Sequence, residues 1–267
     1  MFQHVIDVCR PIRFRGKERL LNWLGPKSGT KKARVFGSLF ELDLDDLIQR
    51  QIYFGTAEPE ETRLVKMRLR AGMTFVDVGA NVGYYTALAA RRVAGNGGRV
   101  IAFEPSPPVF ARLQAMIQAN RLEHATAVQA GLSDSTGCVK LYLGIGSHNH
   151  TPTMVAHENT IATDVRIVTL DDEAERLGIE RIDFLKIDVE GHESKVLAGA
   201  KRLLRERRIR AMLCEFNEHW LTRAGSSTLA LEETIRKSGL VEPHPAGAAR
   251  GLENRFFELP DSRRPTP

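Results

Sequence analysis

The chain has 267 residues, 42% of them hydrophobic and 27% charged, with a formal net charge of +5 and an isoelectric point near 9.2. Such a composition indicates a globular protein without a membrane span, because no apolar run approaches the roughly 20 residues that one needs. Residues 1–12 lack the apolar stretch of a secretion signal and the three cysteines are widely spaced, so we expect a cytoplasmic protein without disulfide bonds or a cysteine metal site.

Positive charge is concentrated in the N-terminal segment. Nine Lys and Arg residues stand against Glu18 alone between Arg10 and Arg34. We expect residues 1–34 to form a basic arm. The arm is either a solvated leader or a surface that attracts an anionic partner, such as an anionic acceptor or a membrane.

The next segment, residues 35–70, is expected to be an extension packed on the core rather than a separate domain. Alternating apolar residues from Val35 to Leu44 predict a β-hairpin about Gly37. Helical segments follow, separated by a polar stretch.

A strand, a glycine turn and a helix come next, and the rest of the chain is organised around them. Residues 74–78 are apolar and rich in β-branched side chains, which predicts a buried parallel strand. Gly79 and Gly83 then lead into a helical segment, residues 84–93. Glycines let a ligand approach the backbone, and free amides at a helix start favour an anionic group.

The spacing of this turn separates two kinds of nucleotide site. A dinucleotide fingerprint needs three glycines in the order G-x-G-x-x-G, whereas this chain has two glycines preceded by Asp77. The pattern D-x-G-x-x-x-G resembles motif I of the class I S-adenosylmethionine-dependent methyltransferases. The resemblance implies that Asp77, Gly79, Asn81 and Gly83 hold the methionine end of that cofactor, with the acid under its amino group.

Strands and helices alternate from residue 74 onward. This alternation predicts an α/β domain with a doubly wound, mostly parallel sheet over residues 71–260, followed by a disordered tail at residues 261–267. Residues 138–144 are expected to add an edge strand. Apolar residues between Val196 and Glu206 predict a single amphipathic helix.

Polar residues at the ends of the second and third strands are candidate cofactor contacts. Glu104 ends the second strand, where a carboxylate can accept hydrogen bonds from both hydroxyls of a ribose. Ser133 and Asp134 follow the third strand. They are either contacts to the adenine or plain turn residues.

Two histidines, His148 and His150, lie in the irregular segment of residues 145–163. No third ligand is spaced to complete a metal site with them. We expect a polar loop that helps to close over the substrate.

A second group of polar residues follows two later strands. Asp188, Glu190 and His192 come directly after a buried apolar strand, and Glu215 follows the next strand. Open α/β sheets bind ligands at the carboxyl ends of their strands, so these four side chains are expected at one rim.

Two segments together resemble the FkbM-type methyltransferases. The first comprises residues 76–85 with Phe-Glu-Pro at 103–105, and the second is Phe-Leu-Lys-Ile-Asp-Val-Glu-Gly-His-Glu at 184–193. The similarity extends from about residue 35 to about residue 240. It implies a Rossmann-like enzyme that uses S-adenosyl-L-methionine to methylate a hydroxyl, typically of a sugar, glycolipid, polysaccharide or secondary metabolite.

Methyl transfer to a hydroxyl is aided by a base. His192 is the expected proton acceptor, because its charge changes near neutral pH, with Glu190 or Glu215 as its orienting partner. Asp188 is expected at both the cofactor and the reacting group. Alternatively, Glu190 and His192 only cap the helix that begins there. A metal held by Asp188 and Glu215 is a competing mechanism, but we expect no metal.

Other classes of function are alternatives. The missing third glycine argues against a nicotinamide dehydrogenase, and the turn at residues 188–191 lacks the Asn/Asp-Pro-Pro-Tyr sequence of many enzymes that methylate nucleobases or amides. Positive charge permits an RNA substrate, yet no aromatic platform accompanies it, and we expect a small-molecule or glycan acceptor instead of nucleic acid. A non-catalytic S-adenosylmethionine-binding protein would show a disrupted cofactor turn, whereas this turn is intact.

Overall fold

The computed structural model describes residue 21 and residues 25–144, 153–156, 160–243 and 252–260. Most of the expected basic arm, both histidines of the 145–163 segment and the expected tail lie outside the described residues. None of the helices in the described part of the chain combines the length and apolar character that crossing a bilayer requires.

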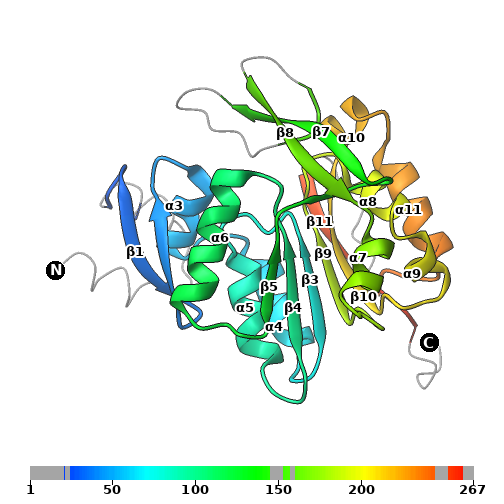
Figure 1. The fold of residues 1–267 in the computed structure, drawn as a ribbon, viewed down its shortest axis with the longest axis horizontal. Coiled ribbons are helices and arrows are strands. Elements are labelled where there is room, and N and C mark those ends of the chain that lie inside the picture. Colours follow the sequence, from blue (N-terminus) through cyan, green and yellow to red (C-terminus); the bar gives the residue numbers. More distant parts are fainter. Residues whose placement is uncertain (1–20, 22–24, 145–152, 157–159, 244–251, 261–267) are drawn as a thin grey trace.

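Six strands form the central sheet in the order β11-β10-β9-β3-β4-β5 (Figure 1). The strands are β3 (Thr74–Val78), β4 (Arg99–Phe103), β5 (Ala125–Val128), β9 (Phe184–Ile187), β10 (Ala211–Asn217) and β11 (Leu252–Glu258). Neighbouring strands are parallel except β11, which runs antiparallel to β10. The predicted mostly parallel α/β sheet is therefore confirmed.

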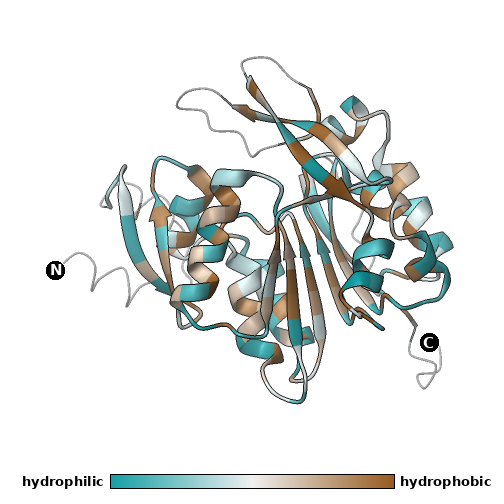
Figure 2. Ribbon diagram, viewed as in Figure 1, coloured by the Kyte–Doolittle hydropathy of each residue, from teal (hydrophilic) through white to brown (hydrophobic). Residues whose placement is uncertain are grey.

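Each face of the central sheet carries its own hydrophobic core, because successive side chains of a strand point to opposite faces. Phe75 of β3 packs in the core that contains the buried side of α5. Val76 and Val78 pack in the opposite core. Figure 1 shows helices on both sides of the sheet, and Figure 2 shows hydrophobic bands along the central strands. The helices are α4 (Pro59–Arg68) and α5 (Tyr84–Val93) on the first face, and α7 (Leu170–Arg176), α8 (Glu193–Ala198), α9 (Lys201–Arg205), α10 (Glu218–Arg223) and α11 (Thr228–Lys237) on the second.

The N-terminal extension packs on the first face beside α6 (Pro107–Ala119). It consists of β1 (Thr30–Val35), β2 (Ser38–Asp43), α3 (Leu47–Phe54) and α4. Phe40 and Leu42 of β2 share a core with Leu113 of α6, and the Leu39 amide donates to Asn120 Oδ1 at 2.6 Å. The predicted hairpin about Gly37 is confirmed. Its first strand begins at Thr30, so it crosses the boundary that we expected at residue 34.

A second sheet stands above the carboxyl ends of the central strands. It has the order β6-β8-β7 and consists of β6 (Gly131–Leu132), β7 (Gly137–Gly144) and β8 (Thr160–Val168). Residues 138–144 form the edge strand that we expected, but as part of β7 at the edge of this second sheet, where it pairs along its whole length with β8. The expected single helix after Val196 is wrong. It divides at Gly199, where a Cβ would lie 1.9 Å from the carbonyl oxygen of Ser133.

The two glycines of the β3–α5 turn are required by packing within the protein. Gly79 has φ +82, and a Cβ there would lie 1.9 Å from the carbonyl oxygen of Asp188, at the end of β9. A Cβ on Gly83 would lie 2.4 Å from the side chain of Met116 in α6. We expected the glycines to make room for a ligand, whereas the structure uses this space for its own chain.

We expect Gly79→Ala to destabilise the fold far more than Gly95→Ala. Both glycines have positive φ, which costs an alanine about 1–2 kcal/mol, but no described atom lies within 4 Å of a Cβ on Gly95. Overpacking against Asp188 adds roughly 1–3 kcal/mol at Gly79. Unfolding in urea measures both free energies. Equal losses in the two variants would contradict this account of the turn.

Candidate active site

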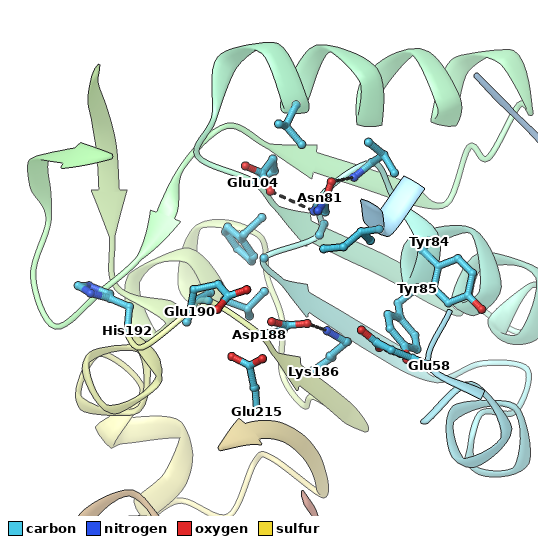
Figure 3. Close-up of a pocket in the computed structure, with 18 of the residues that line it drawn as sticks. Glu58, Asn81, Tyr84, Tyr85, Glu104, Lys186, Asp188, Glu190, His192 and Glu215 are labelled. Carbon is cyan, nitrogen blue, oxygen red and sulfur yellow. Dashed lines mark hydrogen bonds and ion pairs between the residues drawn. The ribbon is translucent and has the colours of Figure 1, made fainter. Parts of the chain in front are cut away.

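A cavity of about 510 Å³ opens at the carboxyl ends of the central strands. Its wall includes the β3–α5 turn, the end of β4, β6 and the segment after β9 (Figure 3). This volume lies within the range of small-molecule and cofactor sites, roughly 300–1,000 Å³. The cavity is therefore the candidate site.

Glu104 is a buried carboxylate held at the cavity wall by two backbone amides. Its Oε2 accepts from the Asn81 amide at 3.0 Å and its Oε1 from the Ser106 amide at 2.9 Å. Burial raises the pKa of Glu104 to about 7, and the two amides oppose this shift. Each carboxylate oxygen can accept a second hydrogen bond. Glu104 can therefore receive ligand hydroxyls while the amides keep it in place.

The backbone amides of the β3–α5 turn already donate hydrogen bonds within the protein. All five N–H groups from Gly79 to Gly83 donate to oxygen atoms of the protein. The expectation that free amides of this turn would favour an anionic group is therefore wrong for these residues. A neutral or positively charged part of a ligand suits the turn better than a phosphate does.

Three carboxylates converge at the rim of the cavity, at the ends of β9 and β10. One oxygen each from Asp188, Glu190 and Glu215 lies within 4.8 Å of the others (Figure 3). We call these residues the acidic cluster. Glu215 is 6% exposed, and its Oε2 has no hydrogen-bond partner among the described residues. Burial and then the charges of Asp188 and Glu190 raise the pKa of Glu215 to about 10.

A buried lysine stands beside the acidic cluster. Lys186 Nζ lies 2.8 Å from Asp188 Oδ2 and 4.7 Å from the ring centroid of Tyr85, whose hydroxyl donates to Glu58 Oε2 at 2.5 Å. Burial alone would lower the pKa of Lys186, but the charges of Asp188, Glu58 and Asp77 outweigh burial and raise it. Burial raises the pKa of Glu58, and Lys186 opposes that shift.

Lys186, Tyr85 and Glu58 were missed by the sequence analysis. A lysine inside the apolar strand β9 was an available signal, because lysine is almost never buried without a partner. Glu58 gave no comparable signal. It caps α4 in the N-terminal extension, with φ +35, and reaches the cavity only through the fold.

The structure brings most of the predicted site residues to one cavity and leaves four outside its wall. Those that line it are Gly79, Asn81, Glu104, Asp188, Glu190, His192 and Glu215. Asp77, Gly83, Ser133 and Asp134 do not line it. Asp77 lies beneath the turn, where its Oδ2 accepts from Thr86 Oγ1 at 2.7 Å. Gly131 and Leu132 of β6, rather than Ser133 and Asp134, form the wall.

His192 lies apart from the acidic cluster, and Figure 3 shows its ring on the other side of Glu190. Its Nε2 lies 2.9 Å from Ser133 Oγ. Burial, followed by the charge of Lys195, lowers the pKa of His192 to about 4, so the imidazole is neutral and weakly basic. His192 is the N-cap residue of α8, in line with the alternative that it caps this helix, but its side chain makes no capping hydrogen bond. Glu193 accepts from the amides of Val189 and Gly191 in the turn before the helix.

Comparison with known proteins shows what the chain resembles. Residues 77–242 match a family model described as the methyltransferase FkbM domain. The chain is 30% identical over 154 residues to methyltransferase sdnD of Sordaria araneosa, across 46% of this chain and 59% of that protein. It is 31% identical over 170 residues to 31-O-demethyl-FK506 methyltransferase FkbM of Streptomyces tacrolimicus, across 51% and 62%. It is 24% identical over 197 residues to hexuronic acid methyltransferase AglP of Haloferax volcanii, across 70% and 76%. The chain thus spans less than two thirds of the first two relatives.

We expect Lys186→Met to lower the free energy of unfolding by about 3–5 kcal/mol, because it leaves the carboxylates around Lys186 without their buried cation. The pKa values of Asp77 and Glu58 are already raised, and without Lys186 they would rise further. An acid whose pKa is raised by folding makes the folded state less stable as pH increases. The free energy of unfolding that Lys186→Met loses should therefore be greater at pH 8 than at pH 5.5.

Chemical unfolding at the two pH values measures this effect. Lys140→Met is the matched control, because Lys140 pairs with Asp164 on the surface and should contribute at most about 1 kcal/mol. A Lys186→Met loss as small as that of the control, or independent of pH, would contradict the role given to Lys186.

Proposed function

Because this chain belongs to the FkbM family of S-adenosylmethionine-dependent methyltransferases, we propose that it transfers a methyl group from this cofactor to a hydroxyl oxygen of a small molecule or glycan. Two relatives support the class of acceptor, since one is named for 31-O-demethyl-FK506 and the other for a hexuronic acid. The main support for the proposal is the position of Glu104, whose carboxylate is held by two backbone amides. It lies beside the β3–α5 turn, whose own amides already donate to oxygen atoms of the protein.

The residues of the cavity fit this cofactor. Glu104 would accept from the two ribose hydroxyls, and Gly131 and Leu132 would border the adenine. The turn at Gly79 and Asn81 would contact the methionine part, which carries no phosphate and so needs no free amides. Asp77 would act from beneath the turn, through Thr86, instead of touching the cofactor.

Methyl transfer to a hydroxyl requires that the acceptor oxygen is positioned and that a nearby group accepts its proton. A sulfonium methyl group is already activated, so the protein has to bring the acceptor oxygen in line with it and exclude water. We assign the proton-accepting role to the acidic cluster rather than to His192. The cluster groups three carboxylates at the rim, whereas the His192 ring contacts Ser133 and is a weak base.

The charge of the cavity restricts the acceptor. Within the described residues its wall carries seven carboxyl side chains and one lysine. The carboxyl groups are those of Glu58, Glu61, Glu104, Asp188, Glu190, Glu215 and Glu253. This wall favours a neutral or cationic reacting portion and disfavours an RNA backbone. An anionic acceptor would have to hold its charge away from the rim.

Methyl transfer itself is tested by incubating the protein with S-adenosylmethionine and a panel of hydroxylated compounds, such as glycosides of hexoses and hexuronic acids and macrolide alcohols. We expect mass spectrometry and nuclear magnetic resonance to detect an O-methyl product. Products methylated on nitrogen, or on RNA alone, would overturn the proposed acceptor class.

We expect Glu104→Ala to weaken S-adenosylmethionine binding by about 1.5–3 kcal/mol, or roughly 10- to 150-fold, the scale of hydrogen bonds to a charged group. Because the pKa of Glu104 is raised to about 7, wild-type affinity should also fall as pH drops below 7, since the charged form is the better acceptor. Calorimetry between pH 5.5 and 8 measures both effects. Glu104→Gln should remove the pH dependence, and unchanged affinity in Glu104→Ala would exclude Glu104 from the site.

We expect Glu190→Gln to lower kcat by about 100- to 10,000-fold and His192→Ala to keep it within about tenfold of the wild type. Turnover is measured at saturating S-adenosylmethionine, with cofactor affinity and melting temperature as controls for folding. The reverse order of effects would return the proton-accepting role to His192.

A further inference from the structure

We propose that the acidic cluster is a binding site for one divalent cation with a preference for oxygen ligands, such as Mg²⁺, Mn²⁺ or Ca²⁺. The proposal differs from the expectation, drawn from the sequence, that the protein holds no metal. It adds a ligand to the proposed active site, and only its effect on methyl transfer rests on the proposed function.

The geometry of the three carboxylates suits a single ion. One oxygen each from Asp188, Glu190 and Glu215 lies within 4.8 Å of the other two. Three oxygens that are 4.8 Å from one another lie about 2.8 Å from their common centre, slightly more than the 2.3–2.6 Å of a Ca²⁺–oxygen bond. A small side-chain rotation would therefore bring them to one Ca²⁺ ion, and a larger one to Mg²⁺ or Mn²⁺.

A buried oxygen without a partner is the second, independent observation. Glu215 is 6% exposed, lines the cavity and points toward the other two carboxylates in Figure 3. Its Oε2 has no hydrogen-bond partner among the described residues. A buried carboxylate oxygen normally has such a partner, and a bound cation would supply it.

Lys186 holds one ligand of the proposed cation site in place and does not occupy the site itself. Its Nζ pairs with Oδ2 of Asp188 at 2.8 Å, which fixes that side chain. Figure 3 shows the other carboxylate oxygen of Asp188 turned away from Lys186, on the side of Glu190. The ligands come from the ends of β9 and β10, two strands in register, and such rigid supports favour a defined coordination geometry.

A cation at this position would lie at the rim where the acceptor hydroxyl has to enter. It would orient the acceptor oxygen and favour its deprotonated form, as bound metal ions do for oxygen ligands, and the proton would pass to the carboxylate oxygen of Glu190 that does not hold the cation. It would also place positive charge among carboxylates that otherwise repel one another.

The test is a titration of the full chain with Mn²⁺ alone, after treatment with a chelator and dialysis, in the absence of S-adenosylmethionine and acceptor. Electron paramagnetic resonance of free Mn²⁺ measures the bound fraction, and calorimetry with Ca²⁺ and Mg²⁺ gives the order of affinity. We expect one saturable site per chain. Glu215→Gln and Glu190→Gln should each weaken Mn²⁺ binding at least tenfold.

Glu61→Gln is the matched control, because it removes a carboxylate from the same cavity without touching the acidic cluster, and it should bind Mn²⁺ as the wild type does. Circular dichroism and melting temperature verify that each variant folds. Glu190 is less buried than Glu215, so its variant keeps the test valid if Glu215→Gln is unstable.

Absence of saturable Mn²⁺ binding, or equal binding in Glu215→Gln, Glu190→Gln and the control, would overturn the proposal. Loss of S-adenosylmethionine affinity in the cluster variants without any Mn²⁺ site would also overturn it and would assign the cluster to a cationic part of the cofactor. Because the titration needs neither cofactor nor turnover, a failure of the proposed methyl transfer leaves its outcome readable.

Discussion

The buried ammonium group of Lys186 is the charge on which the site depends. It lies opposite Asp77 in the register of β3 and β9, pairs with Asp188, and faces Tyr85, which binds Glu58. Carboxylates gathered this closely would repel one another in a medium of low dielectric constant. One lysine therefore links the β3–α5 turn, the rim of the cavity and the N-terminal extension into one electrostatic unit.

The backbone of the site is held in uncommon conformations. Glu58, Asn81 and Glu190 line the cavity with φ of +35, +51 and +50. Each such non-glycine residue costs of order 1–3 kcal/mol and persists only where its surroundings fix it. Asn81 is fixed through the bond from its amide to Glu104, and the carbonyl of Glu190 accepts from Thr153 Oγ1 at 2.8 Å. Three of the seven non-glycine residues with positive φ among the described residues thus line the cavity in which a ligand would be held.

The sequence predicted the parts of the site that follow from strand ends. Glu104, Asp188 and Glu215 each come directly after an apolar run or end it, and parallel strands bring such residues to one edge. Other features depend on long-range contacts that no local pattern encodes. Glu58 is the N-cap residue of α4 in the N-terminal extension, far from the strand ends in sequence. The pairing of His192 with Ser133 joins residues that are 59 positions apart. The packing that requires glycine at position 79 could not be predicted from the sequence either, because the atom that a Cβ there would clash with belongs to Asp188.

We propose that one cavity holds the cofactor between Glu104 and the acidic cluster. A crystal structure of the protein with bound S-adenosylhomocysteine would test this arrangement. We expect the ribose hydroxyls within hydrogen-bond distance of Glu104, the adenine beside Leu132, and the sulfur facing Asp188, Glu190 and Glu215. A ligand bound outside this cavity, or one whose ribose lies away from Glu104, would contradict it.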